Sequence, residues 1–381
     1  MSFRRPLSPA ALACGLLAAA ILARCLRPPE VFSVPSPGTV KAEDMTGRTV
    51  LLDGPPRRIM MLTPVSWHYL LIEGTDQHIL MIPPYMRREI SLSPLSRIFP
   101  ALADRPLAFL DNKSAAAFSV EQSMFQRPDA VLAWDYLSGD FDRAGVQGLI
   151  RISADSGEKE RLFKLLGEMT DKSGRVKNLT DRTEEKKRII FGEALKITSA
   201  REILIIDDDS FSLGTDRYYK RFNFNAGKIH IRNLAEKTGG RNGILNVESL
   251  LSADPEIILI NHFLLASSTI RVEDIYSDER LQGLKAVRNR RVYHLPRGAA
   301  RLEGPLEEHL ALLWLLQTLR PEAPSSLNLR AEIRESYLNG FGYCMSDDEI
   351  DEWLRLKENL QSAGYAGFIR RAPASSEGGA D

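Results

Sequence analysis

Short apolar runs alternate with amphipathic stretches along most of the chain. In the first part such runs lie at 58–62, 77–83, 129–134 and 147–153. In the second part they recur at 201–207, 227–234, 255–261 and 289–296. Runs of this length, rich in Ile, Val and Leu and separated by helical periodicity, are typical of buried parallel strands. The pattern predicts an α/β protein with two Rossmann-like lobes.

The alternation stops between 156 and 198, where two helical patterns follow each other. "GEKERLFKLLGEMTD" is amphipathic, and "KSGRVKNLTDRTEEKKRIIFGEALKIT" is longer and rich in charged helix formers. At 1.5 Å per residue the second segment would span about 40 Å, the size of a small domain. We therefore predict a long rigid inter-lobe α-helix. The apolar segment 307–322 and two helical pieces after it predict a set of C-terminal helices.

The chain has 381 residues, too many for one ordinary core. We expect a small hairpin around "LLDGPP" at the start of the first lobe. The predicted organisation is a signal peptide or N-terminal membrane anchor (1–25), a tether (26–43), an N-terminal α/β lobe (44–155), an inter-lobe helical linker (156–199), a C-terminal α/β lobe with C-terminal helices (200–363) and a disordered tail (364–381).

The N-terminal segment has the layout of an export signal. Arg4 and Arg5 precede an apolar stretch of small residues, and a Pro-rich stretch follows it. An uncleaved anchor is the alternative, because the cleavage site is poor. Cys25 stands where a lipoprotein carries its lipidated Cys, although Arg24 before it is unsuited to that processing. Either way, the segment predicts a periplasmic location or the outer face of the cytoplasmic membrane.

Charge and cysteine content narrow the classes of function. Fifty basic residues balance 50 acidic ones, so nothing indicates a nucleic-acid partner. Cys344 is the only cysteine beyond the N-terminal segment, so we expect no disulfide within the folded body.

Enzyme motifs are weak throughout. The sequence has no G-x-S-x-G, H-E-x-x-H, C-x-x-C or P-loop motif, and its histidines are scattered. The run Asp207, Asp208 and Asp209 at the end of an apolar segment is the one alternative, an exported Mg²⁺-dependent α/β enzyme or phosphotransferase. The later strand that would carry a phospho-acceptor Asp ends in Asn261 instead. We therefore expect a protein that is not an enzyme, with no catalytic residue.

One phrase occurs twice. "SVEQSMFQRPDAVLAW" (119–134) and "NVESLLSADPEIILI" (246–260) each place a small N-capping residue before Val and Glu, and a Pro before an acidic residue and a buried strand. Glu121 and Glu248 thus fall at the second position of a helix, where a carboxylate complements the helix dipole by about 0.3–1 kcal/mol. The helix dipole explains each Glu by itself, but it does not explain why both lobes have a Glu at the same position.

These phrases, with "DMTGRTVLLDGPPRRIMML", "LAEKTGGRNGI", "LKAVRNRRVYHL" and "GPLEEHLALLWLLQTLRPEA", resemble the periplasmic substrate-binding proteins of ABC importers for iron-siderophore, haem and cobalamin, the class III helical-backbone receptors. The resemblance runs from about Met45 to Leu354. It implies a monomer that captures an iron(III) complex between its lobes and delivers it to an ABC permease dimer with its ATPase. Cobalamin or a molybdate-type oxyanion as ligand, and sensing in place of transport, stay open.

The resemblance implies that Glu121 and Glu248 dock onto the permease. It also places the ligand between the lobes, at the carboxyl ends of the strands. Aromatic residues there offer flat contact, arginines bind anionic oxygens, and Tyr or His could ligate iron. No resident cofactor is implied, and the metal ligands stay unknown. The candidates in these loops are Trp67, His68, Tyr85, Arg87, Arg88, Trp134, Tyr136, Arg217, Tyr218, Tyr219, His262 and Arg301.

Overall fold

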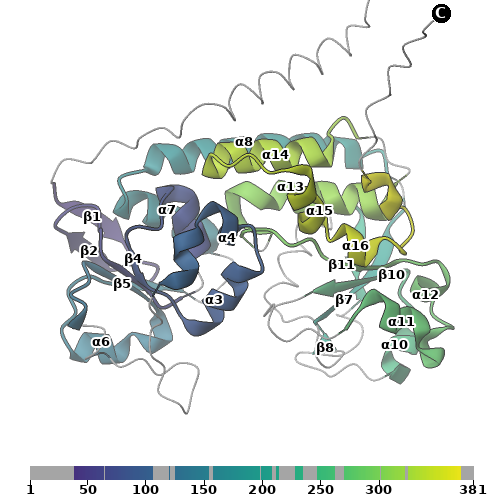
Figure 1. Cartoon of the computed structure of the whole chain (residues 1–381), viewed down its shortest axis with the longest axis horizontal. Coiled ribbons are helices and arrows are strands. Elements are labelled where there is room, and N and C mark those ends of the chain that lie inside the picture. The colour runs from purple at the N-terminus through teal and green to yellow at the C-terminus, as the bar shows by residue number, and fades with distance from the viewer. Residues whose placement is uncertain are drawn as a thin grey trace, which may run out of the picture.

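Two sheets, each built mainly of parallel strands, lie side by side below a layer of long helices (Figure 1). The computed structural model describes residues 38–63, 65–105, 120, 125–153, 158–197, 199–207, 212–213, 228–234, 247–261, 270–300, 302–321 and 325–369. Within these residues no helix is both long and apolar enough to cross a bilayer.

The first sheet has the strand order β4-β3-β5-β6, and all its pairs are parallel. Its strands are β3 (Ile59–Met61), β4 (Ile79–Met81), β5 (Ala130–Trp134) and β6 (Leu149–Ile152). An antiparallel hairpin of β1 (Val40–Glu43) and β2 (Thr49–Leu52) precedes it. The central strand β5 is almost completely buried, as expected of a strand covered on both faces.

The second sheet repeats this order as β9-β7-β10-β11, again with parallel pairs. Its strands are β7 (Arg201–Asp207), β9 (Ile231–Asn233), β10 (Ile257–Asn261) and β11 (Val292–His294). A short strand, β8 (Ser212–Leu213), pairs antiparallel with the end of β7. Each half of the chain therefore builds one sheet of the same topology.

Helices cover the sheets and join them. The described helices are α2 (Ser66–Glu73), α3 (Pro84–Ser91), α4 (Leu95–Ile98), α6 (Gly139–Arg143), α7 (Lys159–Met169), α8 (Ser173–Ala194), α10 (Val247–Ala253), α11 (Val272–Ser277), α12 (Lys285–Arg288), α13 (Gly304–Leu319), α14 (Leu329–Phe341), α15 (Asp347–Leu354) and α16 (Leu356–Asn359). The 22 residues of α8 correspond to about 33 Å. In Figure 1, α8 runs along the top of the molecule from the first lobe towards the second, with α13 and α14 beside it. The predicted fold class is confirmed.

The repeated phrase folds in the same way in both lobes. Arg127 and Asp254, each directly before the Pro of its copy, both adopt a left-handed backbone, with φ of 45° and 40°. Val120 and Val247 both pack against the buried cluster of their own lobe. The strand that follows, β5 or β10, is the third strand along its sheet. The sequence repeat therefore marks a structural repeat.

The C-terminal helices contact the first lobe as well as the second. The Thr183 hydroxyl of α8 donates to the Pro305 carbonyl at the start of α13, at 2.7 Å. Arg175 of α8 donates to the carbonyls of Leu71 in α2 and Gly340 in α14. Arg97 of α4 pairs with Glu352 of α15 at 2.6 Å. The lobes are thus connected by several helices in addition to α8.

Three predictions from the sequence differ from the structure: the place of the hairpin, the start of the tail and the state of Cys344. The hairpin turns at 44–48, ahead of "LLDGPP", so β1 occupies the end of the predicted tether. The 3₁₀ helix Tyr365–Phe368 lies inside the predicted tail, yet Tyr365 is fully buried and its hydroxyl donates to the Leu354 carbonyl. Cys344 is disulfide-bonded, and no other described residue is a cysteine, so its partner lies outside the described residues.

Two glycines give a matched test of this packing. A Cβ at Gly148 would overlap the Asp129 carbonyl, so we expect Gly148→Ala to lower the free energy of unfolding by about 1–3 kcal/mol. Gly192 lies in α8 with nothing within 4 Å of an added Cβ, so Gly192→Ala should raise it by about 0.5–1 kcal/mol. Urea unfolding measures both. Equal effects of the two substitutions would contradict this packing.

Candidate functional site

The first candidates follow β3 and are buried. Trp67 and His68 open α2 and are 4% and 5% exposed. The Trp67 and His68 rings lie 5.8 Å apart, and the His68 ring meets Phe163 of α7 edge-on at 5.1 Å. A Cβ at Gly304, where α13 begins, would press against the same Phe163 ring. His68 therefore lies where α2, α7 and α13 meet, and its ring is packed between them.

An exposed aromatic pair follows β5. The rings of Trp134 and Tyr136 are stacked, with centroids 6.2 Å apart and planes inclined by 13°. Tyr136 is 65% exposed, while Trp134 packs partly against the core. The Asp135 carboxylate accepts from the Tyr136 N–H at 2.8 Å, and the Ser138 hydroxyl donates to the Asp135 carbonyl. The turn is thereby held with the Tyr136 ring nearly parallel to that of Trp134 and open to solvent.

The basic candidates of α3 differ from each other. Arg87 is half-buried and donates to the Arg105 carbonyl at 2.7 Å. Arg105 in turn lies 3.5 Å from the Asp76 carboxylate. Arg88 is exposed in the last turn of α3 and is the more accessible cation. The side chain of Tyr85 lies outside what the structure describes.

All five ligand candidates of the second lobe fall outside the described residues: Arg217, Tyr218, Tyr219, His262 and Arg301. Asp208 and Asp209 fall outside them too, and of Asp207 only the backbone is described. The Asp207 backbone pairs with Asn261 on one side and Ser212 on the other. Among the described residues, no group of three His, Cys, Asp or Glu side chains could hold a metal ion.

A buried carboxylate, which the sequence pattern did not reveal, fixes the loop after β11. Glu307 of α13 is fully buried and accepts the backbone N–H groups of Ala299, Ala300 and Leu302 at 2.7, 3.0 and 2.9 Å. The Tyr337 hydroxyl donates a fourth hydrogen bond to it. Four donors saturate the two carboxylate oxygens. Glu307 therefore shapes the loop that contains the candidate Arg301.

Burial and hydrogen bonding have opposite effects on the pKa of Glu307, the partner of Tyr337. Burial raises the pKa of the Glu307 carboxyl, and the four donated hydrogen bonds oppose that rise. Burial, together with the neighbouring Glu307 carboxylate, raises the pKa of Tyr337 well above its ordinary value, so the phenol stays protonated and donates. The only signal in the sequence is a pair of acidic residues at the start of an apolar helix, which does not say which one is buried.

Of the two docking candidates, the structure describes one. Glu248 is exposed in the first turn of α10, the position that the repeat predicts. Glu121 lies outside the described residues.

Two sheets of equal topology, joined by a helical layer, form a two-lobed α/β fold, and in such sheets ligands bind at the carboxyl ends of the strands. The sequence model of the periplasmic binding protein family matches residues 126–299. A comparison with curated protein sequences gave no match. The resemblance predicted from the sequence is confirmed by this family match together with the fold.

Solved structures show the same fold at low sequence identity. A periplasmic solute-binding protein of Veillonella parvula has a TM-score of 0.75 at 22% identity, covering 85% of this chain and 99% of its own. The Helicobacter pylori protein CeuE, in a complex with nickel and histidine, has a TM-score of 0.63 at 19% identity, covering 83% and 99%. The Haemophilus influenzae protein MolA, bound to molybdate, has a TM-score of 0.65 at 14% identity, covering 80% and 99%. The ligands of these proteins differ, so the fold alone does not select one.

Proposed function

We propose that this chain is the solute-binding protein of an ABC importer, located in the periplasm or on the outer face of the cytoplasmic membrane. It captures an iron(III) complex, a siderophore or haem-like chelate, between its lobes and delivers it to the permease. The observation that carries the choice of ligand is the stacked Trp134–Tyr136 pair at the carboxyl end of β5, in which the Tyr136 ring is exposed. A flat aromatic surface suits a catecholate or a macrocycle, whereas an oxyanion gains nothing from contact with the ring faces.

The native ligand is the direct test. The protein is purified from its own host under non-denaturing conditions, then examined by absorbance and by mass spectrometry of the released ligand and metal. We expect a coloured, iron-containing complex. A molybdate-type oxyanion, the ligand of the neighbour MolA, would overturn the proposed ligand while leaving the class intact.

Tyr136→Ala tests the aromatic pair. Because Tyr136 is largely exposed, its removal should leave the fold intact and weaken binding of an aromatic chelate by about tenfold. Phe125→Ala is the matched control, since Phe125 is exposed on the same lobe but precedes β5. Fluorescence titration measures both. Unchanged affinity in Tyr136→Ala would place the ligand elsewhere.

The helical layer predicts only a small change of shape on binding. Lys186 of α8 pairs with Glu332 of α14 at 2.8 Å, and Lys187 of α8 pairs with Glu308 of α13 at 3.3 Å. These pairs and the contacts of Thr183 and Arg175 hold α8 on both helices, so hinge rotation about α8 is resisted. Small-angle scattering of free and loaded protein should give nearly equal radii of gyration. A wide closure would contradict this.

For delivery, we propose that Glu121 and Glu248 contact basic residues of the permease. They occupy equivalent positions in the repeated phrase, one on each lobe, and Glu248 is exposed. Two carboxylates at a fixed separation set the register of docking more than its affinity.

A further inference from the structure

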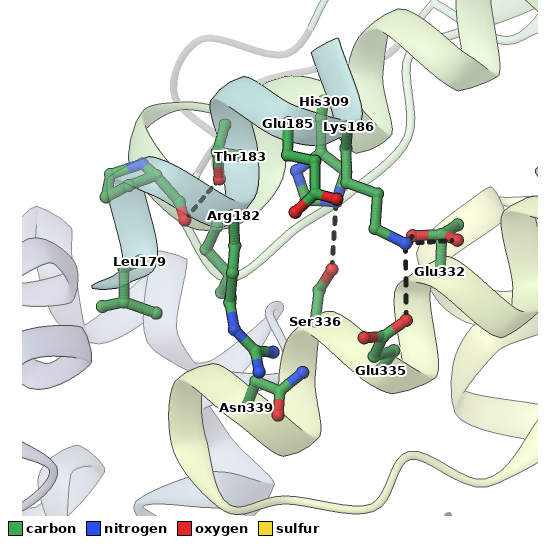
Figure 2. A pocket seen from close by; sticks show the side chains of 12 residues that line it. Leu179, Arg182, Thr183, Glu185, Lys186, His309, Glu332, Glu335, Ser336 and Asn339 are labelled. Carbon is green, nitrogen blue, oxygen red and sulfur yellow. Dashed lines mark hydrogen bonds and ion pairs between the residues drawn. The ribbon is translucent and has the colours of Figure 1, made fainter. Parts of the chain in front are cut away.

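A pocket of 260 Å³ lies among the helices α8, α13 and α14. None of its lining residues belongs to the candidate site at the strand ends. Figure 2 shows side chains of α8 facing those of α14 across it, with His309 of α13 at the back. Pockets for drug-sized ligands are about 300–1,000 Å³, so this one suits a smaller molecule.

One end of the pocket is rich in carboxylates. The Lys186 ammonium lies 2.8 Å from Glu332 and 3.5 Å from Glu335, so two carboxylates share one cation. Glu185, one residue earlier on α8, is exposed and adds a third carboxylate to the lining. Negative charge is therefore in excess at this end, which favours an ammonium group over an anion.

The other end carries one cation. Arg182 of α8 is exposed and makes no ion pair with any residue that the structure describes. In Figure 2 its guanidinium reaches toward the Asn339 amide of α14. Guanidinium is the side chain best suited to bind a carboxylate through two parallel hydrogen bonds.

An uncharged wall separates the two ends. The His309 ring lies with its Nε2 3.1 Å from the Ser336 hydroxyl. Burial, with Lys186 and Lys187 nearby, lowers the pKa of His309 to about 3, so the ring is neutral at physiological pH. The pocket thus has a cationic end, a neutral middle and an anionic end.

We propose that this pocket binds a small zwitterion, a free amino acid, with its carboxylate at Arg182 and Asn339 and its ammonium group at Glu185 and Glu335. Arg182 and Glu185 are three residues apart on α8, so the two ends are separated by about one helical turn, roughly 5 Å. Asn339 and Glu335 lie four residues apart on α14, so both helices present a partner for the carboxylate and a partner for the ammonium group on neighbouring turns. An inorganic anion would meet the excess carboxylates, and a simple amine would leave Arg182 unpaired.

Calorimetric titration of the full chain with single L-amino acids tests the proposal. We expect at least one to bind with a dissociation constant below about 1 mM. Arg182→Gln and Glu335→Gln should each weaken that binding at least about tenfold, since each removes one of the two charge contacts. Arg188→Gln is the matched control on the same helix, because Arg188 is exposed and outside the pocket lining.

Two further measurements keep the result unambiguous. The thermal midpoint of free Arg182→Gln should equal that of the parent, since Arg182 makes no ion pair with a described residue, and binding of the iron chelate should be unchanged in all variants. The proposal is overturned if no amino acid binds below about 1 mM, or if binding survives both substitutions. Acetate or ethylamine binding as tightly as the amino acid would also overturn it.

Discussion

A Glu121→Arg/Glu248→Arg variant is expected to fold and to bind its ligand as the parent does, yet to lose uptake by the importer at least about tenfold. The physical reason is like-charge contact with a basic surface of the permease, which costs several kcal/mol where an attraction stood before. Each single reversal should give an intermediate loss, because each lobe keeps or loses its own contact. Transport of radiolabelled iron complex into cells or vesicles measures the effect.

Glu160→Arg separates docking from helix capping. Glu160 is exposed in the first turn of α7, as Glu248 is in the first turn of α10, so its reversal disturbs a helix dipole in the same way. We expect normal uptake in this control. If uptake survives in the double variant, the two glutamates serve only their helices, and the docking surface lies elsewhere.

The largest effect on stability is expected at Glu307. Glu307→Ala leaves the N–H groups of Ala300 and Leu302 and the Tyr337 hydroxyl without their acceptor in a fully buried site, while the Ala299 N–H keeps only the Tyr337 oxygen. Losses of this kind cost about 1–3 kcal/mol for each unsatisfied group before relaxation, so we expect a total of at least about 3 kcal/mol. Urea unfolding measures it. Ligand affinity should fall as well, since the loop after β11 loses its fixed shape.

Two milder variants test whether the lost hydrogen bonds of Glu307 cause the loss of stability. Tyr337→Phe removes one of the four donors and should cost about 1–2 kcal/mol. Glu308→Gln changes the neighbouring residue, whose side chain is partly exposed and paired with Lys187, and should cost less than about 1 kcal/mol. If Glu307→Ala proved as mild as Glu308→Gln, the loop would be held by other contacts.

The strands could be predicted because burial on both faces produces continuous apolar runs. The segment 201–207 coincides with β7, and the repeated phrase led to two strands at equivalent places in two sheets. Their parallel pairing follows from the helical segments between them. The same pattern placed Trp134 and Tyr136 at a strand end, where the structure stacks them.

What could not be predicted depends on contacts between distant segments. Tyr365 belongs to a stretch without periodicity, yet it is buried in the main core, and its hydroxyl also accepts from the Trp314 indole N–H, far away in sequence. Glu307 and Glu308 are adjacent and chemically equal, and only the packing of α13 on α14 makes the first internal. Histidine is a common ligand residue, so His68 became a candidate. The sequence did not show that its ring packs against α7 and α13.

The contacts between the first lobe and the C-terminal helices affect how the chain matures. One buried cluster runs from Ala42 through both sheets to Phe368, and it includes α2 and α7 of the first lobe together with α13 and α14. A nascent chain ending before Gly304 would therefore expose the apolar faces that α13 and α14 later cover. The first lobe cannot complete its core before α13 and α14, in the last fifth of the chain, are made. A chain that stays incompletely folded until synthesis ends is a suitable substrate for translocation across a membrane in an unfolded state.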